Sequence, residues 1–200
     1  MSVAQMDLAF APAHVARLSV TGELGYEIYT PAMHLPSLLD AMMGEQDGLD
    51  ARHIGIYAIK SLRLEKSFGI WSREYSRDYT PRMARLERFI DYNRPGFIGR
   101  DAALRDRDAV PARRLVTLSI DTHDADASGY EPIYLGGRMV GYVTSGDYGH
   151  CAQASLAMGY IDSAVADDER GLTVAVLGEA RACRILTQPA IDPSGARMRT

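Results

Sequence analysis

Lysine and cysteine are scarce in this sequence. Only two of the 200 residues are lysines, Lys60 and Lys66, so arginine carries almost all of the positive charge. Arginine favours fixed, planar contacts over flexible point charges. The two cysteines, Cys151 and Cys183, have no close second cysteine or histidine at the spacing of zinc ligands. Two reduced thiols are therefore expected rather than a disulfide.

Sequence features that would direct a chain to a membrane are also missing. No apolar run approaches the roughly eighteen residues that a membrane-spanning helix needs. The first residues, Met-Ser-Val-Ala-Gln-Met-Asp, lack the basic stretch and the apolar core of a signal peptide. A net charge of −4 disfavours nucleic acid or an anionic membrane as the main partner. We expect a cytoplasmic protein with no membrane partner and no nucleic acid partner.

Common cofactor and catalytic motifs are absent as well. The sequence contains no Gly-x-Gly-x-x-Gly, no P-loop and no nucleophile elbow, so no flavin, nicotinamide or nucleotide site is predicted. The histidines share no metal-ligand spacing, and no metal site is predicted. The run His-Asp-Ala-Asp at residues 123–126 has the composition of an acid–base pair. A solvated loop between two domains is the favoured interpretation of this run.

The composition that remains is typical of a globular protein, with 46% apolar and 24% charged residues. The length fits one or two domains. The hydrophobic periodicity changes near residue 110, because helix and strand patterns alternate before this point and strand patterns follow it. The sequence therefore predicts two parts with different architectures.

The first part combines short strands with helices. Strands are predicted at residues 15–21 and 26–30, joined by a hairpin loop at residues 22–25 whose two glycines can take positive φ. Apolar residues at i, i+3, i+4, i+7 and i+8 predict an amphipathic helix over residues 35–43. A second helix, mostly buried, is expected to begin with Asp50 as its N-cap and to end by residue 69. Two more helices are predicted, a short one that begins at Thr80-Pro81 and a charged surface helix over residues 99–107.

The second part consists of short alternating segments. Strands are predicted at residues 114–120, 132–135, 138–144, 155–161, 172–177 and 180–186, with glycine turns between several of them. Strands of this number and length predict a small antiparallel barrel or sandwich. The polar run Thr-Ser-Gly-Asp-Tyr-Gly-His at residues 144–150 is interpreted as a barrel turn, with an anion-binding loop as the alternative.

One carboxylate of the first part, Glu27, lies in the strand predicted at residues 26–30. Side chains alternate along a strand, so Glu27 and Tyr29 share one face while Tyr26, Ile28 and Thr30 share the other. On the residues alone, the simplest interpretation is a solvent-facing glutamate beside a core tyrosine. If Glu27 is buried instead, it needs a partner, because a buried, unpartnered carboxylate costs several kcal/mol or becomes protonated.

These residues belong to a series of runs that resemble a known family. The first run is Thr-Gly-Glu-Leu-Gly-Tyr-Glu-Ile-Tyr at residues 21–29, and the second is Gly-Ile-Tyr-Ala-Ile-Lys-Ser-Leu-Arg-Leu-Glu-Lys at residues 55–66, followed by Trp71. Further matches follow in family order, among them Phe-Ile-Gly-Arg-Asp-Ala-Ala-Leu at residues 97–104 and Val-Thr-Ser-Gly at residues 143–146. The sequence resembles the glycine cleavage T-protein (aminomethyltransferase) family, and within it the C-terminal folate-binding module of dimethylglycine and sarcosine dehydrogenases.

The resemblance implies an α+β fold in which a mixed α/β folate-binding lobe precedes a small antiparallel β-barrel. Residues 1–110 would be the second half of the folate-binding domain, residues 111–190 the C-terminal β-barrel, and residues 191–200 a tail. The amino-terminal half of the family's module, which supplies the family's catalytic aspartate, is not in this sequence. No catalytic residue is therefore assigned.

The resemblance also implies a site for tetrahydrofolate. In the family, the glutamate at the position of Glu27 pairs with the pterin ring, whose ring N–H and amino group a carboxylate accepts together. Tyr26, Ile28 and Tyr29 are expected beside it, Trp71 near the pocket, and Glu27 itself in a dry cavity. Arg88 is expected either to bind the ligand, through a ring or its glutamate tail, or to be an ordinary surface arginine.

Two functions are compatible with this resemblance. The first is a truncated or split tetrahydrofolate-binding aminomethyltransferase, which moves a one-carbon unit from a glycine-derived amine and is inactive alone. The alternative is a non-catalytic scaffold or assembly subunit derived from the family. Both predict uncovered apolar surface on the helices at residues 35–43 and 54–64. A homodimer would cover this surface, as would a partner chain carrying the missing half-module or a dehydrogenase.

Overall fold

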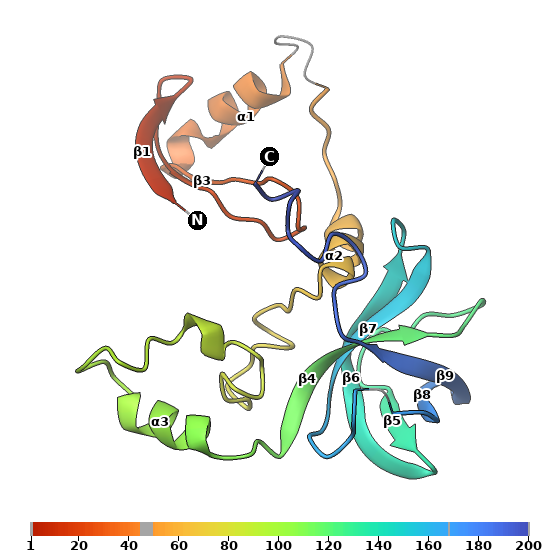
Figure 1. Ribbon diagram of the computed structural model, residues 1–200. Helices are drawn as coiled ribbons and strands as arrows, with labels where there is room; N and C mark the ends of the chain where they lie inside the picture. The colour runs from red at the N-terminus through yellow and green to blue at the C-terminus, as the bar shows by residue number, and fades with distance from the viewer. Residues whose placement is uncertain (1, 45–49, 168, 200) are drawn as a thin grey trace. The chain divides into compact units, whose positions relative to one another are not determined.

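The computed structural model describes residues 2–44, 50–167 and 169–199 of the chain (Figure 1). The chain divides into two compact units: unit 1 comprises Met1–Lys60 and Ser194–Thr200, and unit 2 comprises Ser61–Pro193. The division falls within α2 (Ile56–Glu65). Within the described ranges, none of the helices combines the length and the apolar character that crossing a membrane requires.

Unit 1 is built on a three-stranded antiparallel sheet in the order β1-β2-β3. β1 (Val3–Leu8) and β2 (Ala11–Ala16) form a hairpin, and β3 (Glu27–Tyr29) pairs with β2. The two residues of the β1–β2 turn, Ala9 and Phe10, have φ values of 47° and 65°. Positive φ at both central residues gives the tight turn a twist that matches the strands.

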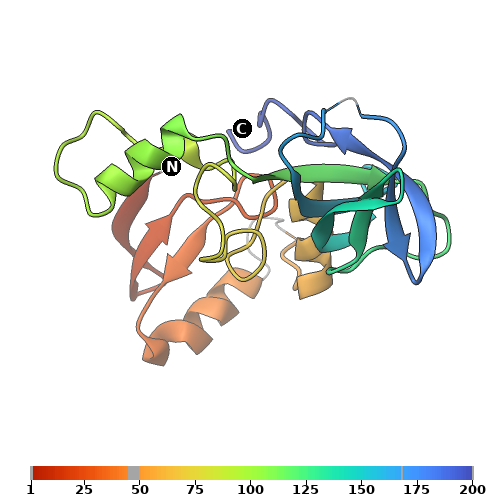
Figure 2. The same cartoon turned by 90° about the horizontal axis from the view of Figure 1, so that it is seen from below.

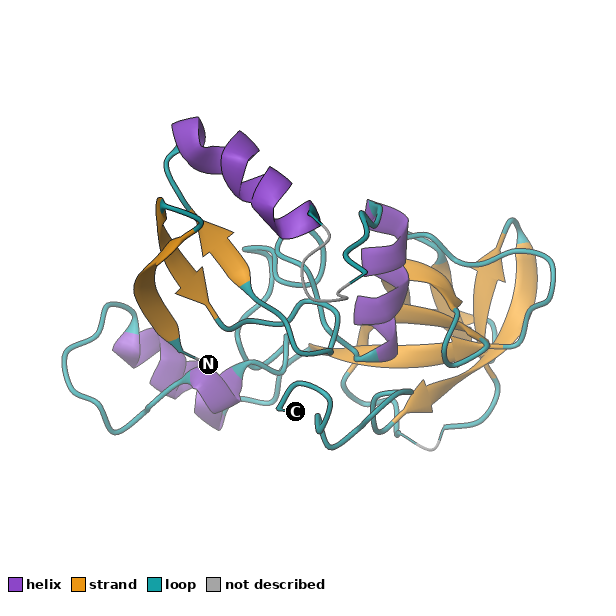
Figure 3. Cartoon of the chain, turned by 90° about the horizontal axis from the view of Figure 1, so that it is seen from above, coloured by secondary structure: helices purple, strands orange, loops and turns teal. Residues whose placement is uncertain are grey.

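One face of this sheet lies against a helix. The 3-10 helix η1 (Ala32–His34) leads into α1 (Leu35–Met43), which lies beside the sheet in Figure 3. Leu38 of α1 is buried, as are Ala11 and Ala13 of β2. The apolar spacing predicted this helix, and the observed bounds confirm it.

Unit 2 contains a closed antiparallel barrel with the strand order β4-β7-β6-β5-β8-β9 (Figure 2). Its strands are β4 (Arg113–Ile120), β5 (Pro132–Leu135), β6 (Arg138–Gly149), β7 (Ala154–Asp162), β8 (Leu172–Val176) and β9 (Glu179–Leu186). Alternate side chains, such as Leu118, Val143 and Ile161, point inward and form the barrel core. At Gly141 a Cβ would lie 2.1 Å from the Tyr160 carbonyl oxygen, so glycine permits the close approach of β6 to β7.

The outer face of the barrel carries a second apolar cluster. Leu64 of α2 packs there with Leu115 of β4 and with Leu156, Met158 and Tyr160 of β7. The chain between α2 and β4 is mostly irregular and includes η2 (Glu87–Phe89) and α3 (Arg100–Asp108). α3 confirms the predicted charged helix. The helices and the closed barrel together confirm the α+β class and decide for the barrel over the sandwich.

The predicted hairpin near the start of the chain is wrong in its loop. β2 ends at Ala16, which pairs with Glu27, so residues 17–26 connect the strands in place of residues 22–25. The Ser19 hydroxyl accepts the Gly22 backbone N–H at 2.9 Å, which favours a local turn over a strand. β1 is missing from the predicted strands, because almost all of its residues are exposed and no buried face marks it.

The predicted start of the second helix is also wrong. α2 begins at Ile56, and the Asp50 carboxylate pairs with Arg52 instead of capping a helix. Its burial differs from the prediction as well, because Ile56 and Tyr57 are 72% and 78% exposed. Only the second half of α2, which packs on the barrel within unit 2, is buried.

The helix predicted from Thr80-Pro81 is reduced to a single turn. The Thr80 hydroxyl accepts the Met83 N–H at 3.3 Å, as an N-cap does. The turn stops at Arg85, which has a φ of 57°. The Met83 carbonyl accepts the Leu115 N–H of β4 at 2.8 Å, so pairing with the barrel replaces the bond that a longer helix needs.

The polar run at residues 144–150 is not a turn. Residues 144–149 continue β6, and Gly146 and Gly149 pair with Ala157 and Ala154 of β7. A Cβ at Gly146 would lie 2.4 Å from the Ala127 carbonyl oxygen. The small residues therefore reflect close packing of the backbone rather than a turn.

Candidate functional site

Glu27 opens β3, the strand that pairs with β2 in unit 1. The strand alternates as expected, with Glu27 and Tyr29 on one face and Ile28 on the face that carries α1. The Glu27 carboxylate accepts a hydrogen bond from the Tyr29 hydroxyl. This bond, and next the negative charge of Glu27, raise the pKa of Tyr29. Tyr29 therefore stays protonated and holds one carboxylate oxygen in place.

The rest of this sheet face mixes polar and apolar residues, because Ala16 lies opposite Glu27 and Val3 lies opposite Ala16. In the register of the strands, His14 lies opposite Tyr29 and Gln5 lies opposite His14. Glu27 is half-buried, whereas Tyr26 and Tyr29 are each 58% exposed. The described residues of unit 1 therefore do not form the dry cavity expected around Glu27, and a ligand on this face would need further cover from outside the sheet.

Ile28 faces a different environment. It lines a cavity of about 740 Å³ whose other lining side chains include Phe10 at the hairpin tip and Leu38 and Met42 of α1. These groups are nearly all apolar, and Phe10 is fully exposed. Among the residues that the structure describes, the lining of the cavity contains no charged group, so this lining suits an apolar side chain. The side chains of Ile28 and Glu27 therefore lie on opposite faces of β3.

Trp71 and Arg88 both belong to unit 2. Trp71 is 76% exposed and stands in a turn over residues 71–75. Arg88 lies on η2, and its guanidinium lies over the Phe89 ring at 4.8 Å from the centroid. Both Arg88 and Phe89 are exposed, so the guanidinium stacks on its own neighbour and remains accessible to solvent. Glu27 and Tyr29 are in contact within unit 1, whereas Trp71 and Arg88 lie in unit 2.

Sequence reasoning missed a buried cluster of charges in unit 2. Arg63 of α2 and Glu74 form an ion pair at 3.2 Å, with side-chain exposures of 2% and 0%. Burial lowers the pKa of Arg63, although the charge of Glu74 partly offsets this effect. Glu65, also buried, accepts the backbone N–H groups of Cys151 and Ala152 at 2.6 and 2.9 Å. The signal in the sequence is weak, because buried and solvated charges look alike in a charge-rich segment.

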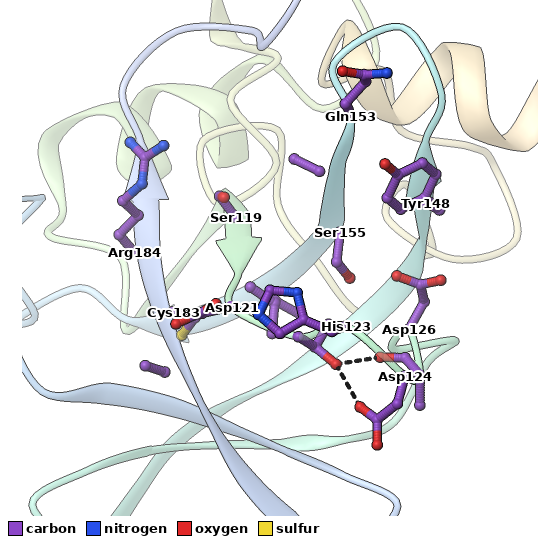
Figure 4. A pocket seen from close by; sticks show the side chains of 15 residues that line it. Ser119, Asp121, His123, Asp124, Asp126, Tyr148, Gln153, Ser155, Cys183 and Arg184 are labelled. Atoms are coloured by element: carbon purple, nitrogen blue, oxygen red, sulfur yellow. Dashed lines mark hydrogen bonds and ion pairs between the residues drawn. The ribbon is translucent and has the colours of Figure 1, made fainter.

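A pocket of about 750 Å³ lies at one end of the barrel (Figure 4). Residues 123–126, predicted as a solvated loop between two domains, lie instead in the connection between β4 and β5 within unit 2. They line the pocket together with residues of β4, β7 and β9. Asp124 accepts a hydrogen bond from Thr122 and pairs with Arg181 at 2.9 Å. Burial raises the pKa of Cys183, which also lines the pocket, to about 12, so its thiol is protonated at neutral pH. Across the described ranges, no group of histidine, cysteine and acidic side chains has the arrangement of a metal site.

Comparison with known proteins adds a family relationship to this geometry. A family model described as the GCVT N-terminal domain matches residues 1–94, and one described as the glycine cleavage T-protein C-terminal barrel domain matches residues 113–192. The mitochondrial dimethylglycine dehydrogenase of Homo sapiens is 37% identical over 191 residues, which cover 94% of this chain and 22% of that protein. An aminomethyltransferase of Desulforamulus reducens is 31% identical over 88% of this chain and 48% of its own length.

A solved structure shows the same fold. The glycine cleavage system aminomethyltransferase T from Bartonella henselae superposes with a TM-score of 0.80 and 26% sequence identity. The match covers 90% of this chain and 50% of that structure. The chain therefore spans about a fifth of the dehydrogenase and about half of the two aminomethyltransferases.

Proposed function

Because this chain belongs to the glycine cleavage T-protein (aminomethyltransferase) family, we propose that it binds tetrahydrofolate and takes part in one-carbon transfer from a glycine-derived amine. Folate-related one-carbon transfer is the chemistry of the family. The ligand, the donor and the binding residues are our proposal for this chain. The observation that carries it is Glu27, a half-buried carboxylate steadied by Tyr29 on an open sheet face.

The chemistry of Glu27 fits one edge of a pterin. That edge presents a ring N–H and an amino group side by side, and an ionised carboxylate offers about four acceptor positions on its two oxygens. Tyr29 occupies one of these positions, so enough remain for two further donors. Charge-assisted hydrogen bonds of this kind are about twice as strong as neutral ones. Glu27 is therefore proposed to orient the ring, with Tyr26 beside it as an exposed aromatic surface.

Trp71 and Arg88, which belong to unit 2, are proposed as further folate-binding residues. Trp71 exposes an aromatic face large enough to stack on a flat ring. The exposed guanidinium of Arg88 is suited to a carboxylate of the glutamate tail or to a ring. Ile28, which faces the apolar cavity, is proposed to support β3 rather than to touch the ligand. These roles concern binding and orientation.

The transfer step itself is proposed for an assembly larger than this chain. The chain spans 48% of the aminomethyltransferase from Desulforamulus reducens, so the activity of a whole relative does not carry over to it. Positioning and the exclusion of water supply much of the rate in a reaction of this type. We therefore propose weak tetrahydrofolate binding by the chain alone, and transfer once the rest of the module covers the open sheet face, in the same or a second polypeptide.

Fluorescence of Trp71, the single tryptophan, provides a direct test of ligand binding. We expect tetrahydrofolate to quench it saturably below about 1 mM, because a stacked ring alters the surroundings of the indole. The control is Trp71→Phe, which removes the signal and keeps a smaller ring, so calorimetry should still detect heat of binding. If titration of the wild type gives neither quenching nor heat, the proposal fails and the non-catalytic scaffold is the better account.

Exposed apolar side chains in unit 1 support the second proposal, association with another chain. Phe10 is 100% exposed and Met33 is 82% exposed, and Leu35, Leu39 and Met42 of α1 are each about half exposed. Surfaces of this kind are typical of interaction sites. The proposed partner is a second copy of the chain, or a chain that carries the other half-module or a dehydrogenase.

Sedimentation at micromolar concentration tests self-association. We expect a dimer, and we expect Phe10→Ser to weaken it by roughly 10- to 150-fold, because a buried phenylalanine contributes roughly 1.5–3 kcal/mol. Ile98→Ser is the matched control, since Ile98 is as exposed as Phe10 but belongs to unit 2. A wild-type monomer would contradict the homodimer.

A further inference from the structure

The segment that carries Trp71 is irregular, yet its backbone is held at several points. The Ile70 N–H donates to the Glu74 carboxylate at 2.9 Å, and the Tyr75 N–H donates to the Ile70 carbonyl at 3.1 Å. The Gly69 N–H donates to the Tyr75 hydroxyl at 3.1 Å. A Cβ at Gly69 would lie 2.7 Å from that of Glu74, so the segment folds tightly on itself. Residues 69–75 therefore form one compact turn.

Glu74 joins this turn to the barrel. One carboxylate oxygen accepts the Thr144 hydroxyl at 2.5 Å and also the Ser145 hydroxyl. The other accepts the Ile70 N–H and pairs with Arg63 at 3.2 Å. Four donors thus fill the acceptor capacity of a side chain that has no exposed surface. A carboxylate bound by four donors is held in a single orientation.

The barrel strand is distorted at this point. Neighbouring residues of a regular strand point to opposite faces, so Thr144 and Ser145 would not normally reach the same oxygen. In β6 the register with β7 shifts between Val143 and Ser145. A bulge of this kind re-aims a side chain, and here both hydroxyls point to Glu74. The bulge therefore allows both hydroxyls to bond to the Glu74 carboxylate, and a strand without the bulge would lose one of these two hydrogen bonds.

A second side chain of the turn reaches the same part of the barrel. Arg73 donates to the Thr144 carbonyl at 3.2 Å, and its guanidinium lies 5.2 Å from the centroid of the Tyr130 ring. Arg73 and Glu74 thus bind inward, while Trp71 in the same turn is 76% exposed. The barrel holds two consecutive residues of the turn and leaves the indole facing solvent.

We propose that Glu74 is a positioning residue that fixes the turn at residues 69–75 on the bulge of β6 and so presents Trp71 in one orientation to the ligand. The consequence for ligand binding rests on the proposed function of Trp71, whereas the anchoring of the turn does not. A turn that is already ordered loses little further freedom on binding, which improves affinity.

The test compares Ser145→Ala with Ser61→Ala. Both hydroxyls are buried in unit 2, but Ser61 donates to the Tyr148 carbonyl at 2.7 Å and does not touch the turn. Three quantities are measured on the full chain: hydrogen exchange of the Ile70 amide, the fluorescence anisotropy decay of Trp71, and tetrahydrofolate affinity by calorimetry. Glu74→Gln is a third variant if it folds.

In Ser145→Ala we expect the Ile70 amide to exchange about tenfold faster, the anisotropy of Trp71 to decay further, and tetrahydrofolate to bind about fivefold more weakly. In Ser61→Ala all three should stay within about twofold of the wild type at a comparable loss of stability. Unchanged Ile70 exchange in Ser145→Ala, or equal changes in both variants, would overturn the proposal. If the wild type does not bind tetrahydrofolate, the proposed function is overturned instead. Hydrogen exchange of the Ile70 amide and the anisotropy decay of Trp71 would still test whether Glu74 anchors the turn.

Discussion

Substitution of Glu27 by glutamine is expected to weaken tetrahydrofolate binding by roughly 30- to 150-fold, or about 2–3 kcal/mol. Glutamine keeps the shape of the side chain but removes the charge and turns one acceptor into a donor. That donor would face the donors of the pterin edge, so one hydrogen bond is lost and a polar group is left unpaired. Calorimetric titration of both proteins gives the ratio of dissociation constants.

The control for this result is Glu23→Gln. Glu23 is a partly exposed carboxylate in the connection before β3, and it pairs with Arg197 at 2.9 Å in the same unit. We expect the affinity of the Glu23→Gln variant for tetrahydrofolate to stay within about twofold of the wild type, since an exposed ion pair contributes little to stability. An equal loss in the two variants would indicate a general effect of charge and would remove Glu27 from the site.

The second large effect concerns the stability of unit 2. Glu74→Leu leaves the Arg63 guanidinium buried without its partner, and we expect a loss of about 3–5 kcal/mol in the free energy of unfolding. The double variant with Arg63→Met should recover part of this loss, because two apolar side chains replace two buried charges. Urea unfolding monitored by circular dichroism measures all three proteins.

A surface pair provides the comparison for this prediction. Arg138 and Asp162 have the same 3.2 Å separation as Arg63 and Glu74, but their side chains are 65% and 32% exposed. Asp162→Ala is expected to cost no more than about 1 kcal/mol, because solvent screens the pair. If Glu74→Leu costs as little as Asp162→Ala, the buried cluster does not anchor the turn that carries Trp71.

Periodicity predicted those elements whose burial is one-sided. α1 (Leu35–Met43) and most barrel strands repeat their apolar residues at helix or strand spacing, because one face of each packs on a core. β1 does not, since its residues are almost all exposed. The end of β6 is rich in glycine and polar residues because Gly146 packs against the backbone at Ala127, a contact between distant parts of the chain. Contacts of that kind leave no local pattern.

The candidate site was predictable only in part for the same reason. The alternation of β3 predicted that Glu27 and Tyr29 share a face, and the structure adds the hydrogen bond between them. The polar run at residues 144–150 does hold an anionic group, but this group is the chain's own Glu74. Glu74 lies 70 residues away from Thr144 in the sequence, so only the folded barrel reveals the pairing.

A crystal structure of the chain with tetrahydrofolate or a stable folate analogue tests the central claim most directly. We expect the ring N–H and the amino group of the pterin to donate to the two Glu27 carboxylate oxygens at about 2.7–2.9 Å, with the Tyr29 hydroxyl still bound to that carboxylate. A pterin bound elsewhere, or one that leaves the Glu27 carboxylate in contact with solvent alone, would contradict the account.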